Sequence, residues 1–68
     1  MTIQIALNGE TRQVAKGLSV AGLLELLAIA REQVAVERNR RIVRRADHEQ
    51  TILAAGDEVE IVSFVGGG

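Results

Sequence analysis

Hydrophobic and polar residues alternate at the start of the chain. Ile3, Ile5 and Leu7 are separated by polar or small residues, which is the two-residue period of a half-buried strand. The dipeptide Asn8-Gly9 follows, and both residue types accept the positive φ of a tight hairpin turn. Residues 11–15 then supply a return strand. The opening of the chain therefore predicts a β-hairpin.

The hydrophobic spacing changes to that of a helix after position 19. Ser19 is a good N-cap, because its hydroxyl can accept a hydrogen bond from a free amide in the first turn. Four apolar residues then recur at helical spacing: Val20, Leu23, Leu24 and Leu27. The pattern predicts a helix over about residues 19–30. Gly22 lies inside it, and we interpret this glycine as a point where the helix packs closely on a sheet.

Strand-like alternation returns after the helix. Val34 and Val36 predict a third strand, Asn39 is suited to a turn, and residues 41–44 predict a short fourth strand. Residues 45–55 carry no clear pattern. Gly56-Asp57 then breaks the chain before the last apolar stretch.

Residues 58–65 predict a final strand with two different faces. Val59 and Ile61 share one face, and Glu60, Val62 and Phe64 share the other. The strand is almost continuously apolar toward its end, so we expect it to be central in the sheet. The element order is ββαββ. We predict an α+β fold in which one mixed sheet of four to five strands packs on one helix.

Length and composition limit the domain count and the kind of site. A chain of 68 residues has room for one small domain. We place that domain at residues 1–65 and a flexible glycine tail at residues 66–68. The chain has no cysteine and one histidine, so neither a disulfide nor a cysteine–histidine metal site is expected. His48 is interpreted as a surface loop residue, neither ligand nor general base.

Charge and hydropathy favour no nucleic acid or membrane partner. The formal net charge is −1. Five arginines concentrate in one predicted hairpin: Arg38, Arg40, Arg41, Arg44 and Arg45. They have no aromatic stacking platform, so we favour a solvated turn over an acidic protein partner or RNA. The most apolar run, residues 18–30, is too short to span a bilayer and contains Glu25. No secretion signal is recognised, and a cytoplasmic location is expected.

The sequence ends in Phe64-Val65-Gly66-Gly67-Gly68. Glycines have no side chain to bury and wide backbone freedom, so they suit a thin tail that can be threaded into a partner's active site. A carboxylate there is a poor acyl donor until a partner activates it. The alternative is an ordinary frayed end. No nucleophile and base pair stands out elsewhere, and the glycines are followed by no helix that would make them a phosphate loop. The chain is therefore not expected to be an enzyme itself.

Taken together and in order, these motifs resemble the ThiS family of sulfur carriers in thiamine biosynthesis. The wider ThiS/MoaD group includes the small subunit of molybdopterin synthase and ubiquitin. The motifs that carry the resemblance are Leu7-Asn8-Gly9-Glu10, Ser19-Val20, Leu23-Leu24, Val34-Ala35-Val36-Glu37, Asn39, Ile42-Val43, Arg45, Leu53, Gly56-Asp57, Val59-Glu60-Ile61-Val62 and Phe64-Val65-Gly66-Gly67-Gly68. The resemblance implies a ubiquitin-like β-grasp fold.

The resemblance also implies a mechanism and partners. An E1-like, ThiF-type adenylyltransferase would use ATP to adenylate the Gly68 carboxylate. Sulfur from cysteine, supplied through a cysteine desulfurase, would then replace AMP and leave a thiocarboxylate. A ThiG-type thiazole synthase would accept the sulfur for the thiazole moiety of thiamine. Gly66 and Gly67 would serve tail threading. No cofactor would be bound to the chain itself, since ATP and the cysteine-derived sulfur are used by the partner enzymes.

One side-chain patch is predicted to dock these partners. Val62 and Phe64 should project from the sheet face opposite the helix, with Ala6 and Ala35 nearby. Two other functions stay open. The first is the same chemistry with a molybdopterin-type acceptor, which the absence of proline before the final glycines disfavours. The second is a non-covalent β-grasp adaptor with an inert tail.

Overall fold

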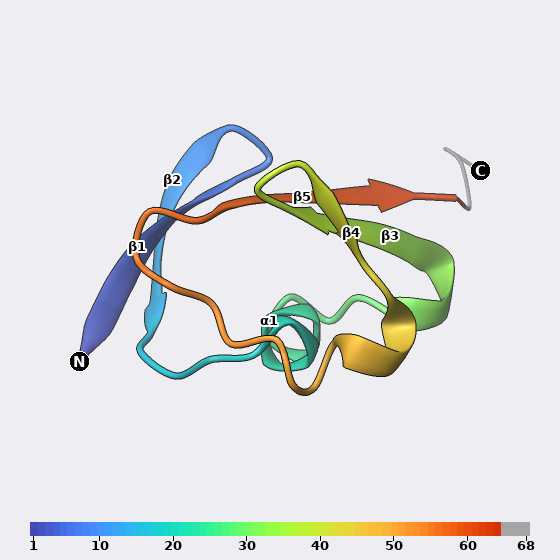
Figure 1. Cartoon of the computed structure of the whole chain (residues 1–68), viewed down its shortest axis with the longest axis horizontal. Coiled ribbons are helices and arrows are strands. Elements are labelled where there is room, and N and C mark those ends of the chain that lie inside the picture. Colours follow the sequence, from blue (N-terminus) through green and yellow to red (C-terminus); the bar gives the residue numbers. More distant parts are fainter. Residues whose placement is uncertain (65–68) are drawn as a thin grey trace.

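The computed structural model describes residues 1–64 and shows one mixed sheet packed on one helix (Figure 1). The elements in chain order are β1 (Thr2–Leu7), β2 (Glu10–Ala15), α1 (Val20–Leu26), η1 (Arg31–Gln33), β3 (Val34–Arg38), β4 (Arg41–Val43), η2 (Arg45–Asp47) and β5 (Glu58–Ser63). The order of strands and helix is therefore ββαβββ: the five strands agree with the predicted sheet of four to five, whereas the predicted ββαββ order lacks one strand. Residues 66–68, the predicted tail, lie outside the described residues.

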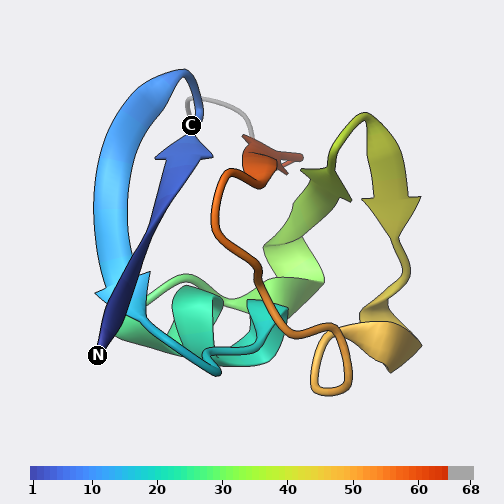
Figure 2. The same ribbon diagram turned by 60° about the vertical axis from the view of Figure 1, so that its left-hand side comes forward.

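The last strand occupies the middle of the sheet, as predicted. The strand order is β2-β1-β5-β3-β4, and Figure 2 shows β2 and β4 at the two edges. β5 runs parallel to β1 and antiparallel to β3. Its two faces differ more than the apolar pattern indicated. Val59 is buried and Ile61 half-buried, whereas Glu58, Glu60 and Val62 are exposed. β5 is therefore central because it is paired on both edges, although one of its faces is open.

The two hairpins form through asparagine turns. Asn8 and Gly9 have φ values of 49° and 83°, and Asn39 and Arg40 have φ values of 53° and 70°. A pair of positive φ values gives the turn whose twist matches that of the flanking strands. Each asparagine therefore sets the register of its hairpin, Leu7 opposite Glu10 and Arg38 opposite Arg41.

The helix begins as predicted and ends earlier. The Ser19 hydroxyl accepts a hydrogen bond from the Gly22 amide at 3.0 Å, which confirms the N-cap. The helix ends at Leu26 and not near residue 30. Ala28 takes a positive φ of 58°, and the amides of Ala28 and Ile29 turn back to the carbonyls of residues 25 and 24 at 3.0 and 2.9 Å. This left-handed cap stops the helix at a residue whose type gives no such signal.

Gly22 packs against a neighbouring side chain and not against the sheet. A Cβ at this position would lie 2.7 Å from Cδ1 of Leu18, the residue before the N-cap. The glycine thus lets the Leu18 side chain fold over the first turn of the helix. The prediction that Gly22 marks close packing of the helix on the sheet is therefore wrong, because its nearest neighbours belong to Leu18 and Ser19.

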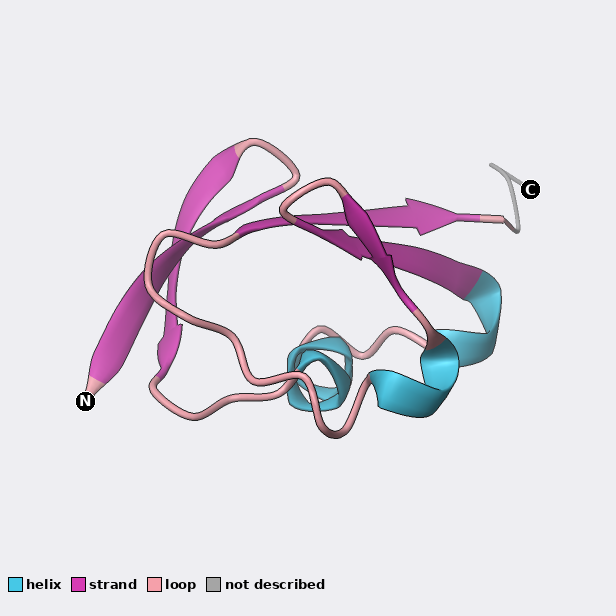
Figure 3. Ribbon diagram, viewed as in Figure 1, coloured by secondary structure: helices cyan, strands magenta, loops and turns pink. Residues whose placement is uncertain are grey.

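The helix α1 lies below one face of the sheet (Figure 3), and a single hydrophobic core joins the two. Its buried members are Ile5, Val14, Val20, Leu23, Leu24, Val34, Val36, Leu53 and Val59. They come from α1, from the long loop before β5 and from every strand except β4, so this small domain depends on contacts among most of its elements for its stability. No helix within residues 1–64 has the length and apolar character needed to cross a membrane.

Candidate functional site

The open face of the sheet carries the predicted docking patch. Val62 and Phe64 are 57% and 63% exposed. Val62 alternates with the inward-facing Val59 and Ile61 along β5, so its side chain lies on the face away from α1. Ala35 pairs directly with Val62 across β3 and β5. The Phe64 amide donates to the carbonyl of Gln33 at 2.9 Å, which keeps the chain beside β3 to the last described residue. Ala35 is half-buried beside the exposed Val62, and the exposed Phe64 follows two positions later. These three apolar residues, called here the docking strip, lie shortly before the predicted tail.

Ala6 lies elsewhere on the same face. It pairs with Glu58, at the beginning of β5, whereas the docking strip lies at the end of that strand. The parallel register of β1 and β5 sets this separation, and that register depends on residues far apart in the sequence. The structure thus brings together three of the four predicted docking residues and leaves Ala6 apart.

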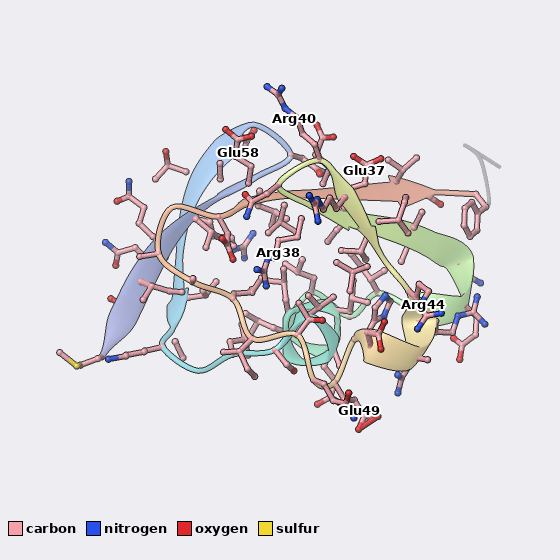
Figure 4. The ribbon with its side chains drawn as sticks, viewed as in Figure 1. Glu37, Arg38, Arg40, Arg44, Glu49 and Glu58 are labelled. Carbon is pink, nitrogen blue, oxygen red and sulfur yellow. The ribbon has the colours of Figure 1, made fainter. Side chains whose placement is uncertain are left out.

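Ala6 borders an acidic hollow of about 420 Å³ on the open face. The hollow is lined by Ala6, Gly9, Glu37, Arg40, Glu58, Val59 and Glu60. Figure 4 shows Glu37, Arg40 and Glu58 on the side of the sheet away from α1. Glu37 and Glu60 are direct cross-strand partners, and like charges in that position oppose each other. The open face is therefore apolar at the end of β5 and acidic at its beginning.

The arginine-rich hairpin divides between two environments. Arg38 points to the α1 side of the sheet, where its Nε lies 3.5 Å from Oδ2 of Asp57. Arg44 pairs with Asp47 at 3.2 Å on the surface. Arg40, Arg41 and Arg45 are exposed. The predicted solvated turn is confirmed for these surface arginines, while Arg38 has a structural role that its position in the sequence did not indicate.

Asp57 holds the beginning of β5 in place. It is 6% exposed, and its carboxylate accepts hydrogen bonds from the Ala54 amide at 2.8 Å and from Nδ2 of Asn39 at 3.1 Å. With the Arg38 guanidinium, these donors compensate the burial of the charge. Sequence reasoning treated Gly56-Asp57 only as a break between elements. No local pattern signals this role, because the partners of Asp57 on the second hairpin are distant in the sequence, Asn39 being 18 positions away.

His48 is buried, which corrects the prediction of a surface loop residue. The side chain is 2% exposed, and its Nε2 lies 3.1 Å from the Val43 carbonyl. Its Nδ1 has no hydrogen-bond partner among residues 1–64. The ring links the 45–50 turn to β4, so this polar residue is part of the packing. Its loop position in the sequence concealed that role.

The described residues do not have the geometry of a metal site. Within residues 1–64, no group of three or more histidine, cysteine or acidic side chains is arranged to hold a metal ion. The predicted sulfur-carrying residue, Gly68, and the threading residues, Gly66 and Gly67, lie outside the described residues. The structure of residues 1–64 therefore supplies the strand that leads to the tail and the surface beside it.

Comparison with known proteins identifies relatives over nearly the whole chain. The model of the ThiS family matches residues 5–68. The crystal structure of the thiamine biosynthesis protein ThiS from Geobacter metallireducens superimposes with a TM-score of 0.83 at 36% sequence identity. The alignment covers 97% of this chain and 100% of that one. The β-grasp fold expected from the resemblance is therefore confirmed.

Sequence relatives differ in length. A thiazole synthase from Magnetococcus marinus is 42% identical over 66 residues, which are 97% of this chain and 20% of that protein. The chain thus spans about a fifth of the length of this relative. The uncharacterized protein ycf40 of Pyropia yezoensis is 36% identical over 66 residues, which are 97% of this chain and 93% of that protein.

Proposed function

This chain belongs to the ThiS family of sulfur carriers in thiamine biosynthesis, and we propose that it carries sulfur on the carboxyl group of Gly68. A member of this family is a carrier protein and not a catalyst. The observation that supports the proposal is the extent of the family match, which runs over residues 5–68 and so includes all three final glycines.

The proposed chemistry has two stages. The Gly68 carboxylate attacks the α-phosphate of ATP in a ThiF-type adenylyltransferase, and pyrophosphate leaves. The acyl-adenylate is a good acyl donor, so a persulfide that carries the sulfur taken from cysteine by a desulfurase displaces AMP and forms an acyl disulfide. A thiol then reduces the sulfur–sulfur bond, and the former persulfide carrier leaves as a disulfide with that thiol. Gly68 then ends in a thiocarboxylate. Both stages require the tail to enter a narrow active site, and glycines at positions 66 and 67 present no side chain to obstruct it.

A thiazole synthase is the proposed acceptor of the sulfur. Two proteins named thiazole synthase, from Magnetococcus marinus and Paramagnetospirillum magneticum, each contain a segment similar to 97% of this chain. A carrier segment within the same polypeptide as its acceptor has a high effective concentration there. For this protein the proposed pairing is between separate chains, the carrier and a thiazole synthase. The proposed location of both is the cytoplasm.

Complementation in two bacterial strains tests the acceptor. One strain lacks its own thiamine sulfur carrier, and the other lacks the small subunit of molybdopterin synthase. The proposal expects growth without thiamine in the first strain and no molybdopterin in the second. Restoration of the second strain alone would assign the molybdopterin pathway. Production of the chain with restoration of neither strain would favour the adaptor alternative.

Phe64→Ala is expected to weaken binding to the adenylyltransferase by roughly tenfold or more, because a large aromatic anchor at an interface is often worth over 1 kcal/mol. Phe64 is 63% exposed, so folding stability should change by less than about 0.5 kcal/mol. The affinity is measured by titration calorimetry and the stability by urea denaturation.

Leu26→Ala is the matched control for the docking strip. Leu26 is 62% exposed and belongs to α1, on the other side of the sheet from the strip. Its truncation removes a similar exposed apolar group and should leave the affinity unchanged. Equal affinities of the Phe64→Ala protein and the unmodified chain would exclude Phe64 from the docking surface.

A further inference from the structure

The edge of β5 that faces β1 loses its partner strand before β5 ends. β1 pairs with β5 at two positions only, Ala6 with Glu58 and Leu7 with Val59. The Asn8 amide adds one more bond, to the Val59 carbonyl at 2.8 Å. β1 then turns away into the first hairpin. The second half of β5, which carries the docking strip and leads to the tail, continues without it.

The Asn8 side chain takes the place of the missing strand. In a parallel ladder, the next bond would join the Ile61 amide to the backbone carbonyl of Asn8. The positive φ of Asn8, 49°, turns the backbone into the hairpin instead. Its carboxamide fills the position: the Ile61 amide donates to Oδ1 at 2.7 Å, and Nδ2 donates to the Ile61 carbonyl at 3.3 Å. One side chain thus reproduces the donor and the acceptor of a peptide group.

Asn39 makes a similar contact at the beginning of β5, with its backbone amide and its side-chain oxygen. It also has a positive φ, 53°, at the corresponding position of the second hairpin. The backbone amide of Asn39 donates to the Glu58 carbonyl at 2.7 Å, and the Glu58 backbone amide donates to the side-chain Oδ1 of Asn39 at 2.9 Å. Two asparagine turns therefore extend the ladders of β5, one at each end. The Asn39 contact lies at the beginning of the strand, and the Asn8 contact lies beside the strip.

We propose that Asn8 is a positioning residue for the loading of Gly68, an inference that rests on the proposed carrier function. Its carboxamide holds the β1-side edge of β5 at Ile61, next to Val62 of the docking strip, while β3 holds the other edge. Once the strip is docked, the direction in which the strand leaves it decides where the tail enters the active site. A small error in that direction displaces the reacting carboxyl group.

Asn8→Gly tests the inference, because glycine keeps the positive φ of the turn and removes only the carboxamide. We expect kcat for adenylation by a ThiF-type enzyme to fall by about tenfold or more, since a misplacement of about 1 Å at a reacting group can cost roughly a hundredfold. The KM for the carrier should change less, because Val62 and Phe64 are retained. Hydrogen exchange of the Ile61 amide should become faster. Asn8→Asp keeps the oxygen acceptor and should recover most of the kcat.

Asn39→Gly is the matched control. It removes the equivalent Oδ1 bond, and also the bond to Asp57, so it should cost more stability than Asn8→Gly. Its kcat should nevertheless stay within about twofold of the unmodified chain, since its contact lies away from the tail. A merely structural role for both asparagines predicts the opposite ranking, with kcat following stability.

Two results would overturn the inference. One is unchanged kcat for Asn8→Gly although the Ile61 amide exchanges faster. The other is a loss of kcat in both variants in proportion to their loss of stability. A failure of the proposed function itself is distinguishable, because then the unmodified chain is not adenylated, and the inference falls with it. All assays are made at a temperature where circular dichroism shows each variant folded.

Discussion

Replacement of Gly67 by valine is expected to abolish sulfur loading at Gly68 and to leave the fold unchanged. Valine adds a branched side chain and restricts φ and ψ at a position that must pass through a narrow active site. The core lies within residues 1–64, so the melting temperature should stay the same. The measurement is the intact mass after incubation with ATP, the adenylyltransferase, a desulfurase and cysteine, together with thermal unfolding by circular dichroism.

Ala15→Val and deletion of Gly68 are the two controls for this prediction, the first expected to load sulfur and the second expected not to. Ala15 is exposed on β2, an edge strand that does not contact β5 in the sheet, so the same added side chain there should allow full loading. Deletion of Gly68 shortens the tail and should prevent loading completely. Full loading of the Gly67→Val protein would contradict the requirement for an unobstructed tail. Complementation by the Gly68 deletion would instead support the adaptor alternative.

Leu24→Ala is expected to lower the free energy of unfolding by about 2 to 5 kcal/mol, the usual cost of truncating a buried leucine. Leu24 is 2% exposed and lies on the face of α1 that packs into the core. For a domain of this length the whole free energy of unfolding is about 3 to 10 kcal/mol, so the variant should be partly unfolded at 37 °C. Urea denaturation followed by circular dichroism measures the loss.

Leu26→Ala provides the control on the same helix. The chemical change is identical, but Leu26 is 62% exposed, so the cost should be less than about 0.5 kcal/mol. The difference between the two variants isolates core packing from helix propensity, which both share. A loss below 1 kcal/mol for Leu24→Ala, judged against the ~2 kcal/mol minimum for such sites, would mean that the helix is not packed as described.

Local patterns were enough to predict most of the fold. Asn8-Gly9 predicted a hairpin because these residues accept the backbone angles that the turn requires, and the structure has those angles. Ser19 predicted the helix start for the same kind of reason, since an N-cap acts within one turn. The face pattern of Val59, Ile61 and Val62 is likewise a local property of a strand.

Features that residue type alone does not indicate were missed. The helix end at Leu26 relies on a left-handed alanine, which residue type does not indicate. The burial of His48 depends on a carbonyl of β4. The carboxamide contact from Asn8 to Ile61 joins residues 53 positions apart. The sequence identified Asn8 as a turn residue, and only the pairing of β1 with β5 shows what its side chain does.

The candidate site was predicted in part for the same reason. Val62 and Phe64 could be placed on the open face from alternation alone, and their exposure agrees. Ala35 follows from the antiparallel pairing of neighbouring elements. Ala6 was misplaced along the sheet because the offset between β1 and β5 is set by non-local pairing. The roles of Gly66, Gly67 and Gly68 stay predictions, since these residues lie outside the described part of the chain.

The intact mass of the unmodified chain tests the central claim most directly. The purified protein is incubated with ATP, a ThiF-type enzyme, a cysteine desulfurase and cysteine, and its mass is compared with that of a sample without ATP. The account predicts a gain equal to one oxygen exchanged for sulfur, located on the peptide that ends at Gly68. An unchanged mass, with partners shown to load another carrier in the same reaction, would contradict it.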